Sequence, residues 1–235
     1  MNYGSLWLIP APLGDENTPW LLEHERLAIV AIKYFIVEAE KTARKHLKAL
    51  GVTSPIRDLD LQLLNEHNQS DDLSKLIQPL LQGLDVGLIS EAGCPAVADP
   101  GANLVALAHT KGIEIKPLVG PSSILMALMA SGANGQRFTF NGYLPADTLG
   151  RKQALKDLEK KSQLSNETQI FIETPYRNMS LIEDALQSLN KQTRFCIACD
   201  LTLPTQKIIS KPVGQWPKDI PNLHKKPCIF ILHHE

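Results

Sequence analysis

The amino-acid sequence predicts two α/β domains, the first built on a parallel sheet and the second on a mixed sheet. In the first half of the chain, short apolar runs alternate with amphipathic stretches, a pattern typical of a parallel sheet wrapped by helices. The pattern changes after the segment GPSS at 120–123, and several strands then follow one another near the end. Their proline-rich connections are too short for crossover helices, so we expect these strands to pair antiparallel. The expected domains are 1–119 and 120–235.

In the first domain, apolar runs between loop segments predict five strands. They are Leu6–Ile9, Tyr34–Val37, a weaker strand around Leu59, Leu61 and Leu63, Val86–Ile89 and 113–118. Thr18 as N-cap and Pro19 at the first helical position predict a first helix. Its expected apolar face comprises Trp20, Leu21, Leu27, Val30 and Ala31. Two further helices are expected at 41–50 and 104–110, with Gly51 and Gly112 as their stop signals. Another is expected to begin at Asp71 and Asp72, and Pro79 should kink or shorten it.

The second domain has the same kinds of local signal in a different order. Helices are expected at 124–130, 151–161 and 181–189, and strands at 138–140, 170–172, 195–198, 207–210 and 228–232. Along the charged helix, Lys152, Lys156 and Lys160 recur every four residues with acids interleaved. A solvated helix face explains that stripe better than a nucleic-acid patch.

Composition restricts the class of protein. The 235 residues are 43% hydrophobic, 21% charged and 6% aromatic, which excludes disordered, collagenous and disulfide-scaffold proteins. The longest apolar run, 124–130, is far shorter than the ~20 residues that span a bilayer, and the N-terminus lacks the features of a secretory signal. The net charge of -1 provides no global attraction to nucleic acid. We therefore expect a cytoplasmic protein that does not bind membranes.

The cysteine pattern does not favour a metal site. Cys196 and Cys199 form a C-x-x-C in the apolar run FCIAC, where a strand directs residues three apart to opposite faces. No second pair or histidine cluster completes four ligands, so we expect no metal and assign these thiols to packing. The sequence also lacks the G-x-x-x-x-G-K-[ST], H-E-x-x-H, G-x-S-x-G and G-x-G-x-x-G motifs, which disfavours nucleoside triphosphatase, zinc peptidase, α/β-hydrolase and dinucleotide-binding functions.

Ligands of open α/β sheets bind beyond the carboxyl ends of the strands, so the loops that follow strands are the candidate site. The loop at 90–101 is longer than the ~2 to 6 residues of an ordinary strand-to-helix turn and carries Glu91 and Asp99. Asp99 alone could equally be a helix cap. The segments at 10–15, 120–123 and 173–178 also follow strands, although Ser122 and Ser123 are consistent with ordinary helix capping and Arg177 with a solvated side chain.

The order and spacing of several segments resemble a known family. These segments are GSLWLIPAPLGD, the pair His67 and Asn68, LISEAGCPAVADPG, PLVGPSSILMALMASG, FNGYLP, IFIETPYRN and CDLT. From about Gly4 to Leu232 the chain resembles the tetrapyrrole methylase superfamily of S-adenosylmethionine-dependent methyltransferases. Within it, the chain is most similar to the branch that methylates ribose 2'-hydroxyls of ribosomal small-subunit RNA.

The resemblance implies a homodimer of two-domain subunits that bind S-adenosylmethionine in a cleft between the domains. The implied contacts of this methyl donor are Pro12, Leu13, Gly14, Glu91, Ala92, Gly93, Val97, Ser122, Ser123, Tyr143, Leu144, Leu201, Thr202 and Pro227. The implied acceptor contacts are Glu38, Glu40, Asn68 and Arg177, of which Arg177 could hold an RNA phosphate. A ribose hydroxyl is a poor nucleophile, so a general base is expected, and Glu91 and Asp99 are the leading candidates because they flank the presumed donor loop.

Two segments depart from the family pattern. Members that act on tetrapyrroles usually have a glycine-rich first loop and Gly-Asp-Pro in the fourth-strand loop, whereas this chain has PAPLGD and Gly-Cys-Pro. The RNA branch usually has Glu-Asp-Thr-Arg and Asp-Ala-Gly-Thr-Pro where residues 38–41 and 91–95 read EAEK and EAGCP. The acceptor is therefore RNA or a small molecule. A binding module that has kept the fold and lost catalysis is the competing hypothesis.

Overall fold

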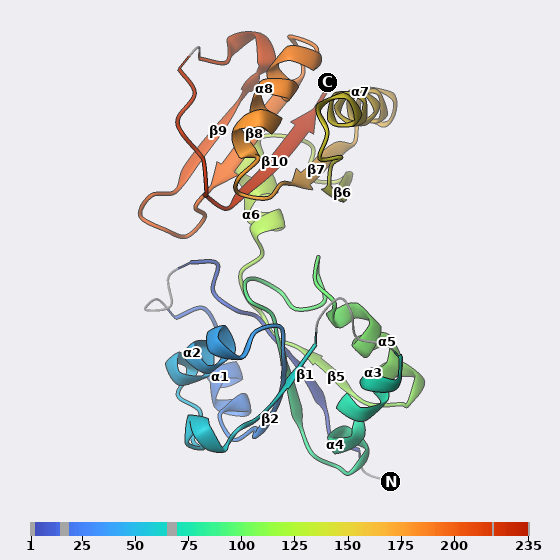
Figure 1. Cartoon of the computed structure of the whole chain (residues 1–235), viewed down its shortest axis with the longest axis vertical. Coiled ribbons are helices and arrows are strands. Elements are labelled where there is room, and N and C mark those ends of the chain that lie inside the picture. The colour runs from blue at the N-terminus through green and yellow to red at the C-terminus, as the bar shows by residue number, and fades with distance from the viewer. Residues whose placement is uncertain (1–2, 15–18, 65–69, 218, 235) are drawn as a thin grey trace. The chain divides into compact units, whose positions relative to one another are not determined.

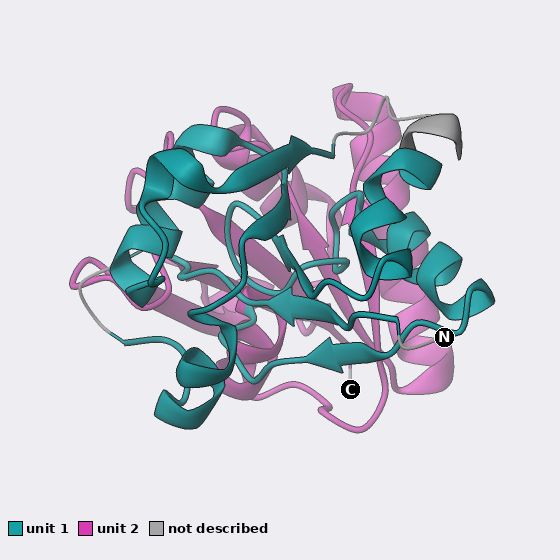
Figure 2. Cartoon of the chain, turned by 90° about the horizontal axis from the view of Figure 1, so that it is seen from below, with its two compact units in different colours: residues 1–122 teal, residues 123–235 magenta. Residues whose placement is uncertain are grey.

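The chain forms two compact α/β units, Met1–Ser122 and Ser123–Glu235, which Figure 2 distinguishes by colour. The structure is a computed structural model that describes residues 3–14, 19–64, 70–217 and 219–234, with the backbone alone at 70–72. Unit 1 contains a parallel sheet and unit 2 a mixed sheet (Figure 1), which confirms the predicted fold class.

Unit 1 is organised around a five-stranded sheet in the order β3-β2-β4-β1-β5, in which all paired strands are parallel. The strands are β1 (Leu6–Ile9), β2 (Tyr34–Val37), β3 (Asp60–Leu63), β4 (Val86–Ile89) and β5 (Ile115–Pro117). The central strand β4 is buried along its whole length, because helices cover both faces of a parallel sheet. Strands β1, β2 and β4 have the predicted bounds, whereas β5 is shorter than predicted and β3 begins one residue after Leu59.

Five α-helices of unit 1 form two layers, one on each side of the sheet (Figure 1). They are α1 (Glu23–Ile29), α2 (Glu40–Leu50), α3 (Ser70–Leu76), α4 (Gln78–Leu81) and α5 (Gly101–Thr110), and a short 3-10 helix, η1 (Ile56–Asp58), precedes β3. Helices α1 and α2 bury their apolar residues with Phe35 and Ile89 on one face, and α3, α4 and α5 pack with Leu88 on the other. Helix α2 ends at Gly51 as predicted.

The first helix begins later than its sequence suggests. Thr18 lies outside the described residues, and Pro19 precedes the helix, which begins at Glu23 after an extended Leu22. The indole Nε1 of Trp20 donates a hydrogen bond to the Pro10 carbonyl at 2.8 Å, so this segment is held against the first loop instead of forming a helical turn. The predicted shortening of the helix before Pro79 is confirmed: α3 ends at Leu76, and Pro79 lies in the first turn of the separate helix α4, where its missing N–H costs no helical bond.

Unit 2 contains a five-stranded sheet in the order β6-β7-β10-β8-β9. Its strands are β6 (Phe138–Tyr143), β7 (Thr168–Ile172), β8 (Arg194–Cys199), β9 (Lys207–Pro212) and β10 (Cys228–His233). Strands β6 and β7 are parallel, and the remaining pairs are antiparallel as predicted. The helices are α6 (Ser123–Ser131), α7 (Thr148–Ser165) and α8 (Asn178–Ser188), and a 3-10 helix, η2 (Val213–Gln215), follows β9.

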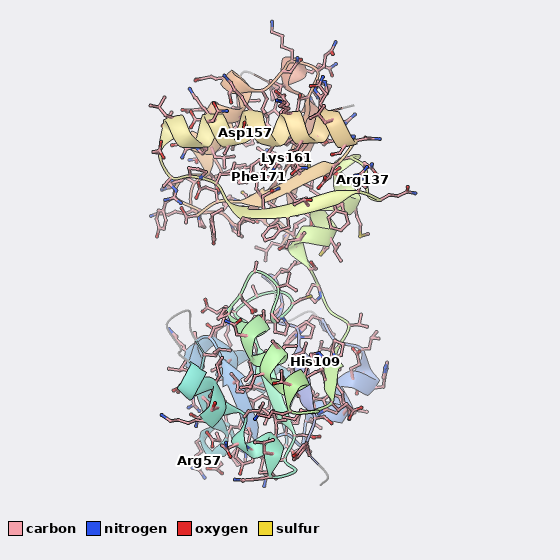
Figure 3. The ribbon with its side chains drawn as sticks, turned by 90° about the vertical axis from the view of Figure 1, so that its right-hand side faces the viewer. Arg57, His109, Arg137, Asp157, Lys161 and Phe171 are labelled. Carbon is pink, nitrogen blue, oxygen red and sulfur yellow. The ribbon has the colours of Figure 1, made fainter. Side chains whose placement is uncertain are left out.

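The core of unit 2 lies between the sheet and the helices α7 and α8. Phe171 stacks on Phe230 and Phe230 on Phe195, and Figure 3 shows Phe171 in the sheet beside α7, which carries the labelled Asp157 and Lys161. Helix α7 is longer than predicted because Asp147 caps it, accepting a hydrogen bond from the Gly150 N–H at 2.8 Å. Helix α6 packs on the opposite face, where its Ser131 carbonyl accepts a hydrogen bond from Ser210 of β9 at 2.5 Å.

The C-x-x-C cysteines and Cys228 lie in the core of unit 2. Cys196, Cys199 and Cys228 are buried free thiols, and burial raises the pKa of Cys196 to about 11. Among the residues that the structure describes, no helix is long and apolar enough to cross a membrane.

Candidate functional site

The carboxyl ends of the parallel strands bring four predicted site segments to one edge of unit 1. Segments 10–14, 38–40, 90–101 and 118–122 follow β1, β2, β4 and β5, and we call them together the unit 1 edge. Because β2, β4, β1 and β5 are consecutive in the sheet, each segment has its neighbours beside it. Every predicted site residue of unit 1 belongs to this edge except Asn68, which, with His67, lies outside the described residues.

The loops after β1 and β4, segments 10–14 and 90–101, are joined through their main chains. The Ala11 N–H donates to the Gly93 carbonyl at 2.8 Å, and the Gly93 N–H donates to the Ala11 carbonyl at 3.0 Å. Gly93 has φ +77°, a left-handed conformation that favours glycine, and an added Cβ would lie 3.4 Å from Leu13 and 3.7 Å from the Pro121 carbonyl. The bridge therefore fixes the position of Leu13 and of the segment 91–97 relative to each other.

Asp99 has a structural role within the fourth loop. Its Oδ1 accepts hydrogen bonds from the Ala96 N–H at 2.7 Å and from the Gly101 N–H, the first residue of α5, at 2.9 Å. Ala96 and Ala98 have φ of +64° and +61°, so the carboxylate holds a backbone that L-residues rarely adopt. Burial raises the pKa of Asp99, and the two backbone hydrogen bonds offset part of that rise. The helix-cap interpretation of Asp99 thus describes its observed contacts.

Glu38 and Glu91 lie together because β2 and β4 are neighbours. Glu38 Oε2 accepts a hydrogen bond from the Glu91 N–H at 2.7 Å, and the Glu91 carboxylate, on an exposed residue, makes a long 3.5 Å contact with the Thr42 hydroxyl. Glu40 is placed differently: at the start of α2 it pairs with Arg44 at 3.0 Å on the surface. The structure therefore brings Glu38 to the fourth loop and directs Glu40 toward its own helix.

Segment 118–122, which follows β5, packs against segments 10–14 and 90–101. Gly120 approaches Pro10 so closely that an added Cβ would lie 2.2 Å from the proline Cβ, and the Cys94 thiol contacts the Pro121 carbonyl at 3.5 Å. The Val119 N–H donates to Glu25 of α1 at 2.9 Å. Ser122 and Ser123 are half-buried, and α6 begins at Ser123, one residue before the predicted start.

In unit 2 the strand directions gather the other predicted site residues at one end of the sheet. The parallel strands β6 and β7 end where the antiparallel β8 ends and β10 begins (Figure 1). We call the segments 143–144, 173–177, 199–203 and 222–227 the unit 2 edge. Tyr143 is 61% exposed, whereas Leu144 and Leu201 are buried, so these two leucines offer a ligand only their main chains. Thr202 and Pro227 are exposed.

The sequence analysis did not single out Glu173, whose carboxylate organises the loop after β7. Its Oε1 accepts hydrogen bonds from Arg177 Nε at 2.9 Å and Nη2 at 2.6 Å, and from the Thr174 N–H at 2.6 Å. Arg177 is therefore paired, not merely solvated, and the hydrogen bonds that it donates to Glu173 raise its pKa. Glu173 Oε2 is buried with no hydrogen-bond partner among the described residues. The i, i+4 spacing of the two charges in ETPYR is the signal that could have revealed the pair.

A second buried carboxylate, Asp200, lies at the same edge and was also missed. It pairs with Lys226 and accepts a hydrogen bond from the Thr205 hydroxyl at 2.9 Å. Burial would raise the pKa of Asp200, but the Lys226 ammonium and the Thr205 hydroxyl outweigh burial and lower it. No group of three or more His, Cys, Asp or Glu side chains that could hold a metal occurs among the described residues.

Comparisons with known proteins agree with this architecture. The chain matches two solved structures along 98% of its length and 94% of theirs: "Crystal structure of the methyltransferase CobJ", with a TM-score of 0.64 and 17% identity, and "Crystal structure of uroporphyrin-III-C-methyltransferase from thermus thermophilus", with 0.56 and 15%. At these identities the likeness shows the fold alone. The fold thus defines the architectural class, a two-unit α/β protein that shares its fold with these two structures.

The sequence comparisons identify the family. The model of the family described as Tetrapyrrole (Corrin/Porphyrin) Methylases matches residues 26–217. The Escherichia coli O157:H7 protein named "Ribosomal RNA small subunit methyltransferase I" is 30% identical over 98% of this chain and 78% of its own length. The Vibrio cholerae protein of the same name is 29% identical over 97% of this chain and 76% of its own. The chain belongs to the tetrapyrrole methylase family, and the predicted resemblance is confirmed.

Proposed function

We propose that this protein transfers a methyl group from S-adenosylmethionine to a ribose hydroxyl of ribosomal RNA. The observation that carries the proposal is the near full-length similarity to the two relatives named as ribosomal RNA small subunit methyltransferases. The acceptor is thereby taken from the relatives, and the atom methylated from the family resemblance. We further propose that the enzyme acts in the cytoplasm as a homodimer.

The proposed methyl-donor site combines both edges. In unit 1 it comprises Pro12, Leu13, Gly14, Glu91, Ala92, Gly93, Val97 and Ser122, and in unit 2 Ser123, Tyr143, Leu144, Leu201, Thr202 and Pro227. S-adenosylmethionine would supply an electrophilic methyl group on a sulfonium. The fit rests on Gly93, where the absence of a Cβ keeps the backbone close to Leu13 and Pro121, and on the exposed Val97 and Tyr143, which offer apolar surface to a nucleoside.

The chain's own residues would position and deprotonate the acceptor. Glu91 and Asp99 are the two candidate general bases, and their contacts differ. One carboxylate oxygen of Asp99 accepts hydrogen bonds from two backbone N–H groups. Glu91 is exposed, and its backbone N–H donates a hydrogen bond to Glu38. We therefore assign the proton transfer to Glu91 and the shaping of the loop to Asp99. Glu38, Glu40, Asn68 and Arg177 remain proposed acceptor contacts, and Arg177 has two of its nitrogens occupied by Glu173.

A small-molecule acceptor is the second candidate function. It is favoured by the description of the matching family, which names corrin and porphyrin methylases. The departures at 38–41 and 91–95 also support a third possibility, a module that binds the methyl donor without transfer. The three differ in what happens after donor binding.

The deciding experiments separate donor binding from transfer. Calorimetric titration with S-adenosylhomocysteine should show binding, and no binding at millimolar ligand would contradict any function that uses the donor. Mass spectrometry of ribosomal RNA nucleosides from cells with and without the gene should then show loss of one ribose methylation. An unchanged profile with intact binding would favour a small-molecule acceptor, and binding with no transfer to RNA, tetrapyrrole or small-molecule acceptors would favour the binding module.

A further inference from the structure

An exposed tyrosine lies at the unit 2 edge with two basic side chains against it. Tyr176, in the loop after β7, is 68% exposed. The His224 ring contacts it at a centroid distance of 5.8 Å and an angle of 75°, and Lys225 Nζ lies over the ring, 5.7 Å from its centroid. The phenol is therefore held by its neighbours although most of its surface is open.

The loops that carry these side chains are fixed to each other by buried contacts. The Lys225 N–H donates to the Pro175 carbonyl at 2.9 Å. The side-chain amide of the fully buried Asn178, at the start of α8, donates to the Lys226 carbonyl at 2.7 Å and to the Leu223 carbonyl at 3.0 Å. Tyr176 and Lys225 thus keep their spacing without a ligand, which lowers the entropic cost of binding one.

At the unit 2 edge the acidic side chains are buried, whereas basic side chains are exposed. In the segments 173–177, 199–203 and 222–227 the acidic residues are Glu173 and Asp200, which are 5% and 4% exposed. Glu173 forms an ion pair with Arg177, and Asp200 forms one with Lys226. Lys225 and His224 are exposed and have no carboxylate beside them within these segments. Within these three segments the exposed charged residues are consequently basic, although the net charge of the whole chain is -1.

We propose that Tyr176, Arg177, His224 and Lys225, here called the Tyr176 surface, bind an unpaired nucleotide of the acceptor RNA, with a base stacked on Tyr176 and a phosphate beside Lys225. The inference rests on the proposed function, because it assumes that the acceptor is RNA. An aromatic ring framed by cations is the arrangement by which proteins bind single-stranded nucleic acid. Within a duplex, base faces are covered by their neighbours, so the ring selects unpaired RNA.

The surface also has a position that suits this role within unit 2. Tyr143 and Thr202, proposed contacts of the methyl donor, belong to the same end of the sheet as Tyr176. Arg177 follows Tyr176 directly in the loop after β7, and its side chain is held at this end of the sheet by Glu173. A nucleotide anchored on Tyr176 would therefore belong to a strand that passes the proposed transfer site.

The test compares binding of a short oligouridylate by the parent and by variants whose melting temperatures are first shown to be unchanged. Tyr176→Leu should weaken binding about tenfold, as expected for the loss of one stacked base, whereas Tyr176→Phe should stay within about twofold because it keeps the ring. Lys225→Gln should weaken binding about threefold and make its salt dependence shallower, since one phosphate contact is lost. Lys156→Gln, an exposed lysine of α7, is the matched control and should bind as the parent does.

Two further measurements separate this proposal from the proposed function. S-adenosylhomocysteine affinity should be the same in the Tyr176 variants and the parent, and a duplex RNA of equal length should bind without regard to Tyr176. Two results would overturn the Tyr176 surface: parent-like oligouridylate binding by Tyr176→Leu, or an equal loss of duplex RNA binding in that variant. Either result would leave the proposed function standing if cells without the gene lose a ribose methylation of their ribosomal RNA. Loss of oligouridylate binding with an unchanged ribosomal RNA profile would support the surface and contradict the proposed acceptor.

Discussion

The two edges that carry the candidate site are held together by different interactions. At the unit 1 edge, main-chain hydrogen bonds between Ala11 and Gly93 join two loops, and residues with positive φ shape the segment between Gly93 and Asp99. The unit 2 edge also has main-chain hydrogen bonds and residues with positive φ, but there the buried carboxylates of Glu173 and Asp200 pair with basic side chains as well. The unit 1 edge should therefore be sensitive mainly to changes of backbone conformation, and unit 2 also to changes of charge.

The largest effect is expected from the buried charge that ties the start of α7 to α8 in unit 2. Arg151 Nη2 lies 2.5 Å from Asp184 Oδ2, with side-chain exposures of 3% and 8%. Arg151→Ala leaves the buried Asp184 carboxylate with only the more distant Lys152 as an ionic partner, so the free energy of unfolding should fall by about 3–5 kcal/mol in urea denaturation. Lys152→Ala removes a more exposed partner of the same carboxylate, 3.4 Å away, and should cost less than about 1 kcal/mol. Similar losses for both variants would contradict this view of unit 2.

At the unit 1 edge, Gly93→Ala should act through the backbone. The substitution places a Cβ at φ +77° beside Leu13, at a cost of about 1–2 kcal/mol, and should displace the bridge to Ala11. S-adenosylhomocysteine binding, measured by calorimetry, should weaken about tenfold. Gly112→Ala is the matched control, because Gly112 has φ +71° with open space around its missing Cβ. It should lose comparable stability and keep the parent affinity; equal affinity losses would show that strain anywhere in unit 1 has the same effect.

A smaller effect is expected where unit 1 continues into unit 2. Ser122→Ala and Ser123→Ala each remove a half-buried hydroxyl near the start of α6. Loss of one neutral hydrogen bond should weaken S-adenosylhomocysteine binding about three- to tenfold in the same titration. Lys156→Ala should leave that affinity unchanged. If both serine variants bind as tightly as the parent and the lysine variant does not, GPSS is only a helix cap and the proposed donor site is misplaced.

The smallest expected effect is a difference in how Asp200, at the unit 2 edge, and Asp99, at the unit 1 edge, change the pH dependence of the free energy of unfolding. The pKa of Asp200 is lowered, so its contribution to stability is present above the unfolded value of about 3.9 and is lost as pH falls through the folded pKa. The pKa of Asp99 is raised, so its ionisation opposes folding, and that cost disappears as pH falls through its folded pKa. Urea denaturation between pH 6 and 3 should show a flatter acid decline for Asp200→Asn and a steeper one for Asp99→Asn. Parallel profiles would contradict the assigned directions.

The sequence alone was sufficient where the signal lies within a few neighbouring residues. The four-residue apolar runs of β1, β2 and β4 have the predicted bounds, and Gly51 ends α2, because burial on both faces and a left-handed cap leave local marks. The short connection between β8 and β9 similarly required antiparallel pairing. The family motifs are local too, so the class of protein was accessible before the structure.

Only the tertiary structure decided which residues of these local segments meet. Trp20 bonds the Pro10 carbonyl and delays α1, Glu38 accepts from the Glu91 N–H across two adjacent strands, and Lys226 lies on Asp200. The last two contacts join segments of neighbouring strands, β2 with β4 and β8 with β10, and the local pattern does not encode this strand order. Asp99 and Glu91 illustrate the limit: both are carboxylates of one loop, and folding alone turned one toward the backbone and left the other exposed.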